Sequence, residues 1–391
     1  MELHSGTRAV SIFAVRVLHV VAADRWTGAA ATALQLVEAL QGAGVECAFA
    51  FRGGHNLAER LAGRDWAHPV LRKERSLTDL RAAFAELRSL AVACDLVHVH
   101  LPHDHLLARV ALARSGPSLV RSLRHRKHLR PDPYHRWLLR GTSGVALANS
   151  ALAPLLGRFA CLRERPAQVL PPVVEPRFLR PPGTSIRAHS RRVARESLGI
   201  PVDAVVAGTV GKLGRGRGHD LLLRAVAATP GVRALVVGHG PGENPLRTLA
   251  AELGISQRVV FAGYVDEGLE DLYPAMDVFV YPAAGSDHGH RAIAEASGSG
   301  LPTVAADLPG VRDLVEPGVT GDVYAPDDAA ALAVLLRRWG GGEALRARTS
   351  SLVARKAAAW TPVALAAAAV ALYERCCRRS APLSSIRFRP T

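Results

Sequence analysis

The stretch AVVAGTVGKLGRGRGHDLLLRAVAAT, residues 204–229, decides the fold. Ala204 to Val210 is typical of a buried strand, Gly211 to Gly218 is a glycine-rich turn, and His219 to Thr229 is typical of a helix. A strand that passes through a glycine-rich turn into a helix is the building block of Rossmann-like domains. Ligands of such domains bind at the carboxyl ends of the parallel strands.

Strand-like and helix-like segments alternate on both sides of this stretch. In the N-terminal half, the expected elements are strands at 16–22, 45–51, 95–100, 118–123 and 145–149 and a helix at 29–43. Beyond residue 229, they are strands at 233–238, 259–262 and 278–281 and helices at 246–253, 291–297 and 328–339. Such alternation predicts parallel sheets that are covered on both faces by helices.

The alternation stops between Leu170 and Ile200, where prolines and then arginines crowd together. We therefore expect an α/β chain with two Rossmann-like domains that face each other across a ligand-binding cleft. The expected parts are an N-terminal domain at 1–180, a linker at 181–200, a C-terminal domain at 201–355, a helix at 356–378 that crosses back to the N-terminal domain, and a tail at 379–391.

The formal net charge of the chain is +15, which favours polyanionic partners. Two arginine-rich runs concentrate this excess. The first run, residues 121–140, contains Asp132 as its only acid, and the second run, residues 177–195, meets no acid until Glu196. Either both runs are solvated basic faces, or they dock onto an anionic membrane surface or a phosphate-bearing acceptor.

The sequence also carries signals about the cellular compartment. Its five cysteines form no C-x-x-C pair, so we expect no disulfide scaffold and a reducing cytoplasm. The apolar stretch 10–23 is interrupted by Arg16 and His19, so it is not expected to be a signal peptide. The apolar stretch 357–373 contains Pro362 and is short for a membrane span. We therefore expect a cytoplasmic protein that is peripheral on the inner face of the cell membrane.

Two clusters of residues carry candidate chemistry. In the 211–218 turn, the glycines allow the backbone to approach a ligand, while Lys212, Arg215 and Arg217 supply positive charge, a combination that suits a diphosphate. After the strand at 278–281, Asp287 precedes a helix that contains Glu295. A phosphate in front of that helix, with carboxylates binding neighbouring hydroxyls, makes a coherent nucleotide-sugar site. Taken alone, Asp287 could equally be a helix cap.

The ordered set of motifs resembles that of the family-4 glycosyltransferases, which have the GT-B fold. The matching segments are Thr27-Gly28-Ala29, Asp95-Leu96-Val97-His98-Val99-His100, Gly211 to Gly218, Gly238 to Pro241, Val259 to Gly263, the Asp287 and Glu295 pair, and Gly300 to Val304. Some positions depart from the family. Asp287 replaces a glutamate, and the family's Glu-Gly-Phe-Gly is changed at 287–290. Lys212 stands where the family has arginine and Arg217 where it has lysine, so the charge is kept while the hydrogen-bond geometry differs.

The resemblance implies a retaining glycosyltransferase. It would transfer a sugar from a nucleotide diphosphate sugar to a glycan or lipid-linked acceptor in cell-surface polysaccharide or lipopolysaccharide biosynthesis. It implies that Lys212 and Arg217 neutralise the diphosphate, that Glu295 binds the ribose hydroxyls and that Asp287 holds the transferred sugar. Together with Asp287, Lys212 and Arg217, His125 is a candidate catalytic residue, because the family often has a histidine there that faces the reaction centre. The remaining donor-binding candidates are Gly28, Gly211, Gly240, His288, Gly289 and His290.

A histidine cluster is compatible with a metal site: His98, His100, His103 and His105, with Asp104. The family's strand accounts for the first two histidines, and no Asp-x-Asp triplet is present. We therefore expect no metal and no other cofactor.

Two other classes of protein stay open. A sugar-nucleotide epimerase also has two Rossmann-like halves. A nucleic-acid-binding protein is suggested by charge alone, and the chain lacks the aromatic platforms and zinc-ligand spacings expected of that class. No nucleic-acid partner is therefore expected.

Overall fold

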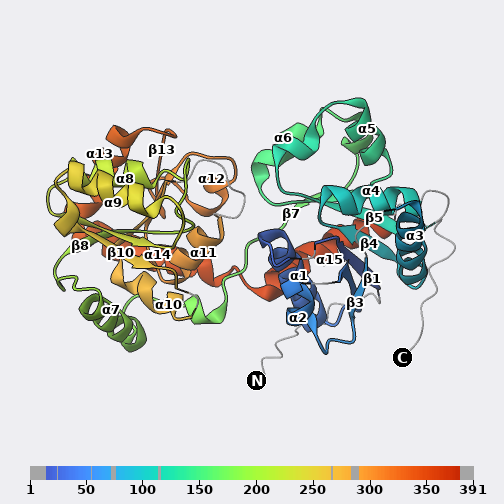
Figure 1. The fold of residues 1–391 in the computed structure, drawn as a ribbon, viewed down its shortest axis with the longest axis horizontal. Helices are drawn as coiled ribbons and strands as arrows, with labels where there is room; N and C mark the ends of the chain where they lie inside the picture. Colours follow the sequence, from blue (N-terminus) through green and yellow to red (C-terminus); the bar gives the residue numbers. More distant parts are fainter. Residues whose placement is uncertain are drawn as a thin grey trace, which may run out of the picture. The chain divides into compact units, whose positions relative to one another are not determined.

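The computed structural model describes residues 15–23, 25–53, 55–71, 76–112, 116–265, 267–282 and 290–378. These residues divide into two compact units (Figure 1). The N-terminal unit comprises the described residues up to Ala148, Leu152–Pro171 and the chain from Pro362 onward. The C-terminal unit comprises Asn149–Ala151 and Pro172–Thr361.

The N-terminal unit is built on a parallel sheet with the strand order β3-β2-β1-β4-β5-β6-β7. Its strands are β1 (Val17–Val21), β2 (Cys47–Arg52), β3 (Ala67–Leu71), β4 (Leu96–Val99), β5 (Ser118–Leu123), β6 (Gly144–Leu147) and β7 (Ala167–Val169). Its helices are α1 (Gly28–Gly42), α2 (His55–Leu61), α3 (Leu77–Val92), α4 (Pro102–Ala111), α5 (Pro133–Arg140), α6 (Ala153–Leu156) and α15 (Pro362–Arg378). Short 3-10 turns are η1 (Arg126–Leu129), η2 (Ser150–Leu152) and η3 (Ala160–Leu162).

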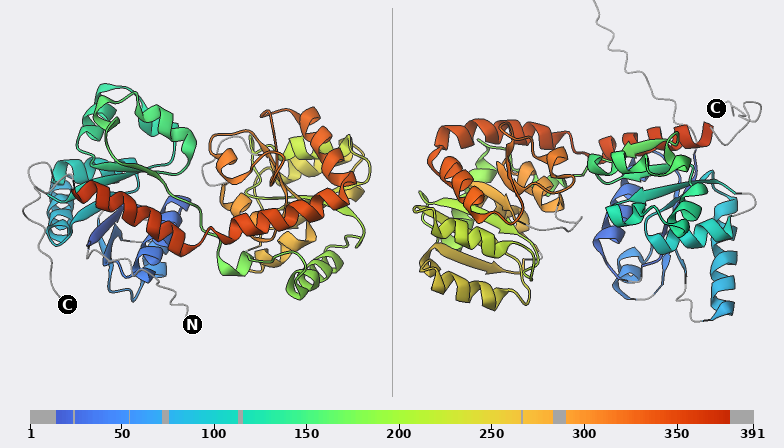
Figure 2. Two further views of the ribbon diagram at one scale, coloured as in Figure 1. Left: turned by 180° about the vertical axis from the view of Figure 1, so that it is seen from behind. Right: turned by 90° about the horizontal axis from the view of Figure 1, so that it is seen from above.

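The central strands of this sheet are buried because helices cover both of its faces. On one face, Leu18, Val20 and Val97 pack against α3 and α4. On the other face, α15 packs against α1 and contacts β5, β6 and β7 (Figure 2). The last described helix of the chain is therefore part of the N-terminal unit.

The C-terminal unit is built on a second parallel sheet with the order β10-β9-β8-β11-β12-β13. Its strands are β8 (Val205–Val210), β9 (Val232–Val237), β10 (Val259–Gly263), β11 (Val278–Tyr281), β12 (Thr303–Ala306) and β13 (Gly321–Tyr324). Its helices are α7 (Ser185–Ser197), α8 (His219–Ala227), α9 (Glu243–Glu252), α10 (Leu269–Leu272), α11 (His290–Gly298), α12 (Val311–Leu314), α13 (Ala329–Gly341) and α14 (Glu343–Ala358). Its 3-10 turns are η4 (Pro176–Phe178), η5 (Ser256–Arg258) and η6 (Tyr273–Ala275).

Two expected segments differ in the structure. The segment expected to be a linker, 181–200, instead contains helix α7, which packs on η6 and α10 of the C-terminal unit. The chain passes from one unit to the other at Pro171 and Pro172. The helix expected at 356–378 is also divided, because α14 ends at Ala358 and Pro362 begins α15. Proline suits the first turn of a helix, where its missing N–H has no partner to lose.

Within the described ranges, no single helix is long and apolar enough to cross a membrane. The bent pair Glu343–Ala358 and Pro362–Cys377, with an angle of 50° between its members, passes the same length and composition test when taken together.

Candidate functional site

At the carboxyl edge of the C-terminal sheet, the 211–218 loop lies next to the end of β11. From β8 the chain runs outward to β10 on one side of the sheet, and from β11 it runs outward to β13 on the other. Neighbouring strands of this kind mark a topological switch point, where the ligands of open α/β sheets bind. The 211–218 loop leaves β8 here, and Pro282 leaves β11. The two segments touch, because a Cβ atom on Gly218 would lie 2.1 Å from the carbonyl oxygen of Pro282.

The glycine turn after β9 fixes the backbone of the cationic loop. The N–H of Leu213 donates a hydrogen bond to the carbonyl of His239 (3.1 Å). Cβ atoms on Gly238 and Gly240 would lie 1.9 Å from the carbonyl oxygens of Gly211 and Leu213, respectively. No side chain fits into either contact, so the predicted donor-site glycine Gly240 acts here by packing one loop against another.

The side chains of the cationic loop differ in exposure. Lys212 and Arg215 are exposed, Arg217 is half-buried, and Leu213 is buried beneath the loop. Burial, and after it the charge of Arg217, lower the pKa of His219 at the start of α8 to about 4. This imidazole is therefore neutral at neutral pH, and the positive charge of the loop comes from its lysine and arginines.

Glu295, on α11, is 6% exposed and is held by two side chains. Its Oε1 accepts a hydrogen bond from Nε of Arg291 (2.7 Å), and its Oε2 accepts one from the hydroxyl of Tyr273 (2.8 Å). Burial raises the pKa of Glu295, and the bonds to Arg291 and Tyr273 oppose that rise. Arg291 also donates to Glu175 (3.0 Å). The carboxylate is thus fixed in one orientation, and each oxygen keeps a further lone pair for a ligand.

No motif marked the two residues that position Glu295. Tyr273 lies in η6, 22 residues from Glu295 in sequence, and nothing in the sequence links the two. Arg291 precedes Glu295 by one helical turn, and this spacing is a signal that could have predicted the pair.

Several predicted site residues lie outside the described part of the chain. They are Asp287, His288 and Gly289, together with the side chain of His290. The structure therefore brings together the cationic loop and Pro282, and the placement of Asp287 and Glu295 beside that loop stays a prediction.

In the N-terminal unit, Gly28 and His125 also follow strands of the sheet. Gly28 is the first residue of α1, which Thr27 caps by accepting the N–H of Ala30 (3.2 Å). His125 follows β5 and caps η1, where its Nδ1 accepts the N–H of Lys127 (3.0 Å). With Nδ1 acting as an acceptor, the neutral ring carries its proton on Nε2.

Asp104, which the sequence grouped with histidines, ties two loops together. Its Oδ1 accepts the N–H of Ala22 and its Oδ2 accepts the N–H of Leu101, both at 2.7 Å, so the loop after β1 is joined to the start of α4. Burial raises the pKa of Asp104 to about 6, and the nearby guanidinium of Arg121 is among the groups that oppose the rise. The carboxylate therefore has a structural task at this edge.

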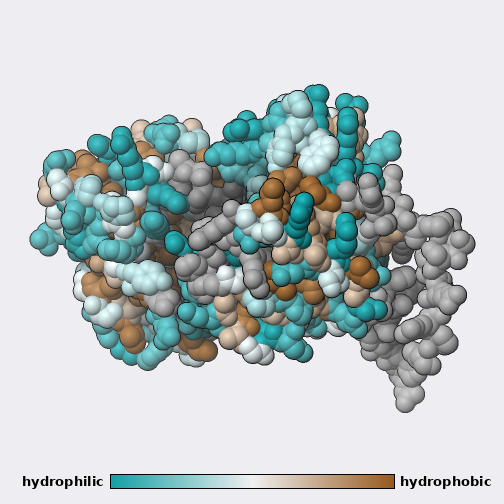
Figure 3. Space-filling model, turned by 45° about the vertical axis from the view of Figure 1, so that its right-hand side comes forward, coloured by the Kyte–Doolittle hydropathy of each residue, from teal (hydrophilic) through white to brown (hydrophobic). Residues whose placement is uncertain are grey.

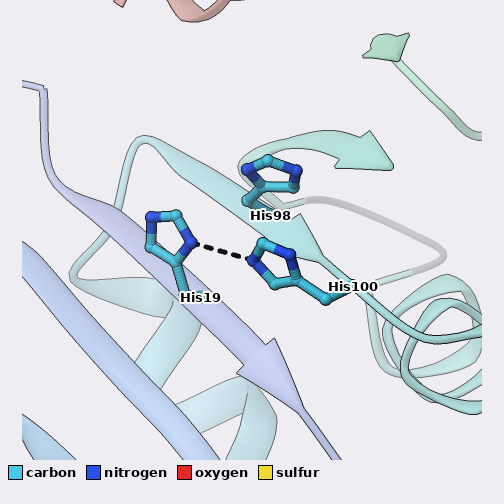
Figure 4. Close-up of side chains that lie close together, drawn as sticks. All are labelled: His19, His98 and His100. Carbon is cyan, nitrogen blue, oxygen red and sulfur yellow. Dashed lines mark hydrogen bonds between the residues drawn. The ribbon is translucent and has the colours of Figure 1, made fainter. Parts of the chain in front are cut away.

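The histidine cluster of the structure differs from the one that the sequence suggested. His98 and His100 meet His19 of β1, and each ring offers a nitrogen within 4.8 Å of the others (Figure 4). His105 instead lies on α4, with its Nε2 at 3.1 Å from the hydroxyl of Thr142. Among the described residues, the His19, His98 and His100 group is the one arranged to hold a metal ion.

Hydrogen bonds already occupy most nitrogens of these three rings. They form a row in which Tyr373 Oη meets His98 Nδ1 (2.7 Å), His98 Nε2 meets Ser122 Oγ (2.9 Å), Ser122 Oγ meets His100 Nδ1 (3.2 Å), and His100 Nε2 meets His19 Nδ1 (3.0 Å). Burial lowers the pKa of His19 to about 3 and those of the other two rings well below their usual value. A metal ion would displace these bonds, which join α15 to the sheet.

Sequence comparison places a known domain in the C-terminal unit. Residues 190–352 match the family described as Glycosyl transferases group 1. The D-inositol 3-phosphate glycosyltransferase of Mycobacterium avium is 38% identical over 161 residues, which cover 39% of this chain and 38% of that protein. The Mycobacterium tuberculosis enzyme is 37% identical over 186 residues, which cover 44% of this chain and 37% of that protein. The chain thus spans less than two-fifths of these relatives and carries a glycosyltransferase group 1 domain.

Solved structures share the fold along nearly the whole chain. Anabaena Alr3699/HepE in complex with UDP has a TM-score of 0.78 and 21% identity, covering 92% of this chain and 99% of that chain. A glycosyltransferase from Rickettsia africae has a TM-score of 0.77 and 15% identity, covering 93% and 98%. The lipopolysaccharide outer core galactosyltransferase WaaB has a TM-score of 0.71 and 15% identity, covering 94% and 99%. The two parallel-sheet, Rossmann-like domains therefore have the GT-B fold.

Proposed function

We propose that this protein is a retaining family-4 glycosyltransferase that transfers a sugar from a nucleotide diphosphate sugar to a glycan or lipid-linked acceptor in cell-surface polysaccharide or lipopolysaccharide biosynthesis. The observation that carries the proposal is the switch point of the C-terminal sheet, where the loop with Lys212 and Arg217 touches Pro282 at the end of β11. The group 1 domain at 190–352 supports sugar transfer over epimerisation and over nucleic-acid binding.

In the proposed reaction, charge stabilisation is the main contribution of the protein. Lys212 and Arg217 lie along the diphosphate and stabilise the negative charge that grows on it as the bond to the anomeric carbon breaks. The acceptor hydroxyl attacks the same face of that carbon, so the configuration is retained. The departing phosphate oxygen takes the hydroxyl proton and leaves as part of the nucleoside diphosphate. This route uses no carboxylate nucleophile, metal ion or other cofactor.

The other predicted residues bind and orient the substrates. Glu295, held by Tyr273 and Arg291, accepts hydrogen bonds from the ribose hydroxyls through its remaining lone pairs. Asp287 holds hydroxyls of the transferred sugar. On the N-terminal unit, Gly28 permits close approach of the backbone to a substrate, and His125 offers its Nε2–H as a hydrogen-bond donor.

The donor is tested with a thermal-shift panel of UDP-, GDP-, ADP- and dTDP-sugars. The Anabaena protein was solved with UDP, so we propose that a UDP-sugar gives the largest shift. At a ligand concentration about 100-fold above Kd, binding adds about 2.7 kcal/mol to the free energy of unfolding. A panel in which no sugar nucleotide raises the melting temperature contradicts donor binding.

The role of Glu295 is tested by Glu295→Gln with the best donor. The amide accepts hydrogen bonds from hydroxyls more weakly than the carboxylate does, so we expect most of the shift to disappear. Glu252→Gln, an exposed position at the end of α9, is the matched control and keeps the full shift. Urea unfolding without ligand shows whether Glu295→Gln is folded. If Glu295→Gln is folded and keeps the full thermal shift with the donor, Glu295 does not bind the donor.

Stereochemistry and location complete the proposal. Retention is checked by NMR of the anomeric proton in the product, and an inverted product contradicts the mechanism. We place the protein in the cytoplasm, peripheral on the inner face of the cell membrane, on the basis of its basic surface.

A further inference from the structure

The two arginine-rich runs of the sequence have different surroundings. In the second run, every arginine has a partner inside the C-terminal unit. Five of them pair with carboxylates and one with a backbone carbonyl. The pairs are Arg177 with Glu175, Arg180 with Asp271, Arg187 with the carbonyl of Arg180, Arg191 and Arg195 with Asp277, and Arg192 with Glu196. In the first run, the only acid is Asp132, which accepts hydrogen bonds from the backbone and ring of His135. The second run is therefore structural, whereas the first run includes exposed cations that could bind a partner.

The exposed cations of the first run lie on η1 and α5. We call this region the η1–α5 surface; its cations are Arg126, Lys127, Arg130, Arg136 and Arg140. Among the residues that the structure describes, none of these cations forms a salt bridge. The opposite side of α5 is anchored by Leu138 and Leu139, and Leu139 packs with Leu129 of η1. Hydrophilic residues cover most of the upper part of the N-terminal unit in Figure 3, where Figure 1 places α5.

Two aromatic residues stand among these cations. Tyr134 is 46% exposed and Trp137 is 41% exposed, and their spacing puts them next to each other on α5. The guanidinium carbon of Arg109 lies 5.4 Å from the centre of the Trp137 ring. Tryptophan and tyrosine rings favour the headgroup level of a bilayer, and arginine and lysine bind the phosphates of anionic lipids.

We propose that the η1–α5 surface docks the protein on a bilayer that contains anionic phospholipids. Its cations contact lipid phosphates, and Tyr134 and Trp137 enter the headgroup layer. A bilayer fits better than single-stranded nucleic acid, because the aromatic residues stand on the outside of one helix and do not line a groove with stacked platforms. The inference extends the membrane part of the proposed function and does not depend on sugar transfer.

The test is flotation of the full chain with vesicles of phosphatidylcholine, with or without phosphatidylglycerol. We expect binding only when phosphatidylglycerol is present, and weaker binding as NaCl rises from about 0.1 to about 0.5 M. The triple variant Arg126→Ser, Lys127→Ser, Arg130→Ser should bind about 100-fold more weakly. The control carries Arg224→Ser, Arg348→Ser and Arg355→Ser, which removes the same charge from exposed positions of the C-terminal unit and keeps wild-type binding.

A second measurement tests the depth of docking. Trp137 is the one tryptophan classed as exposed, so its emission should shift to the blue with anionic vesicles, and the shift should be lost in Trp137→Phe. Equal loss of binding in both triple variants would mean that net charge alone attracts the lipid and would overturn the proposal. Unchanged vesicle binding of the Arg126→Ser, Lys127→Ser, Arg130→Ser variant would also overturn the proposal. The same holds if the protein binds oligonucleotides but not vesicles, and this variant weakens the oligonucleotide binding. The UDP-sugar thermal shift stays intact in every docking variant, which separates this test from that of the donor site.

Discussion

Among the described residues, each unit buries one arginine almost completely, and the two arginines have different partners. Arg195 of α7 is fully buried; its Nη2 binds Asp277 (2.8 Å), its Nε donates to the carbonyl of Ala275, and its Nη1 donates to three further carbonyls. Arg121 of β5 is 2% exposed, and its Nη1 has no hydrogen-bond partner in the described structure. Its charge acts on Asp104 and on the histidines His105 and His128.

The comparison shows two ways to keep basic groups inside a protein. The C-terminal unit gives its buried cation a carboxylate and carbonyl oxygens, which offset the loss of water. The N-terminal unit keeps most of its buried basic side chains uncharged, because burial holds the pKa values of its histidines low. The two units should therefore differ in their response to acid and to substitution.

Acid should produce the largest difference. His19 has a usual pKa of 6.5 and a pKa of about 3 when folded, so below 6.5 the unfolded state takes up the proton first. Stability is therefore lost as the pH falls from 6.5 towards 3. From pH 7 to about pH 5, His19 alone lowers the free energy of unfolding by about 2 kcal/mol. Asp104, with its raised pKa, gains a proton in the folded state and offsets about 1 kcal/mol.

Calorimetry at the two pH values checks this prediction. The N-terminal unit buries His19, His98, His100 and His105, whereas His219 is the buried histidine among the described residues of the C-terminal unit. The transition of the N-terminal unit should move down by more than that of the C-terminal unit. Equal shifts of both transitions would contradict the comparison.

Arg195→Met should give the largest effect of the three substitutions. The substitution leaves Asp277 with one arginine partner in place of two and removes the donor to four backbone carbonyls. We expect the free energy of unfolding to fall by about 3–5 kcal/mol. Urea unfolding measures the loss, and calorimetry of the variant identifies the transition of the C-terminal unit. A loss below about 1 kcal/mol would show that the pairing adds little.

Arg121→Met should have a smaller effect on stability. Nη1 of Arg121 has no partner, but the change also removes a positive charge that acts on the buried Asp104. We therefore expect the free energy of unfolding to fall by less than about 3 kcal/mol. The positive charge of Arg121 lowers the pKa values of His105 and His128, so its removal should make the N-terminal unit less sensitive to acid. Destabilisation as large as that of Arg195→Met would reject the contrast.

The smallest effect is expected for Arg192→Ala. Arg192 and Glu196 form a pair one helical turn apart whose side chains are 56% and 58% exposed. Water and salt screen such a pair, so the loss should be below about 0.5 kcal/mol. This variant is the control for Arg195→Met on the same helix, and a large loss would mean that α7 tolerates no arginine substitution.

The sequence predicts the architecture well because its signals are local. The expected strand at 204–210 is β8 (Val205–Val210), and the expected helix at 291–297 is α11 (His290–Gly298). The short strands β3, β7 and β13 were not expected. Helix α7 was expected to be a linker because prolines precede it and arginines crowd its sequence. The carboxylate that pairs with Arg195, that of Asp277, lies 82 residues away in sequence.

The candidate site was predictable only in part, for the same reason. Glycine turns and charged loops have a recognisable local spacing, so the 211–218 loop and the turn that begins at Gly238 could be identified from the sequence. The convergence of Lys212 and Arg217 with Asp287 and Glu295 stays a prediction. Tyr273 and His19 act through side chains that meet partners from distant strands and helices. Their roles depend on strand order, which no short motif contains.

The row of hydrogen-bonded groups from Tyr373 to His19 limits which tautomers its histidines can adopt. Tyr373, Ser122 and the three neutral imidazoles each have one hydrogen to donate, and four hydrogen bonds join them. One hydrogen is therefore left over, at Tyr373, at the Ser122 hydroxyl or at Nε2 of His19, because the Ser122 oxygen can accept from both neighbouring rings. Ser122 has one hydrogen and can donate to only one of those rings, His98 or His100. His19 and His100 share a bond, so a change of tautomer at one ring obliges the other to change with it.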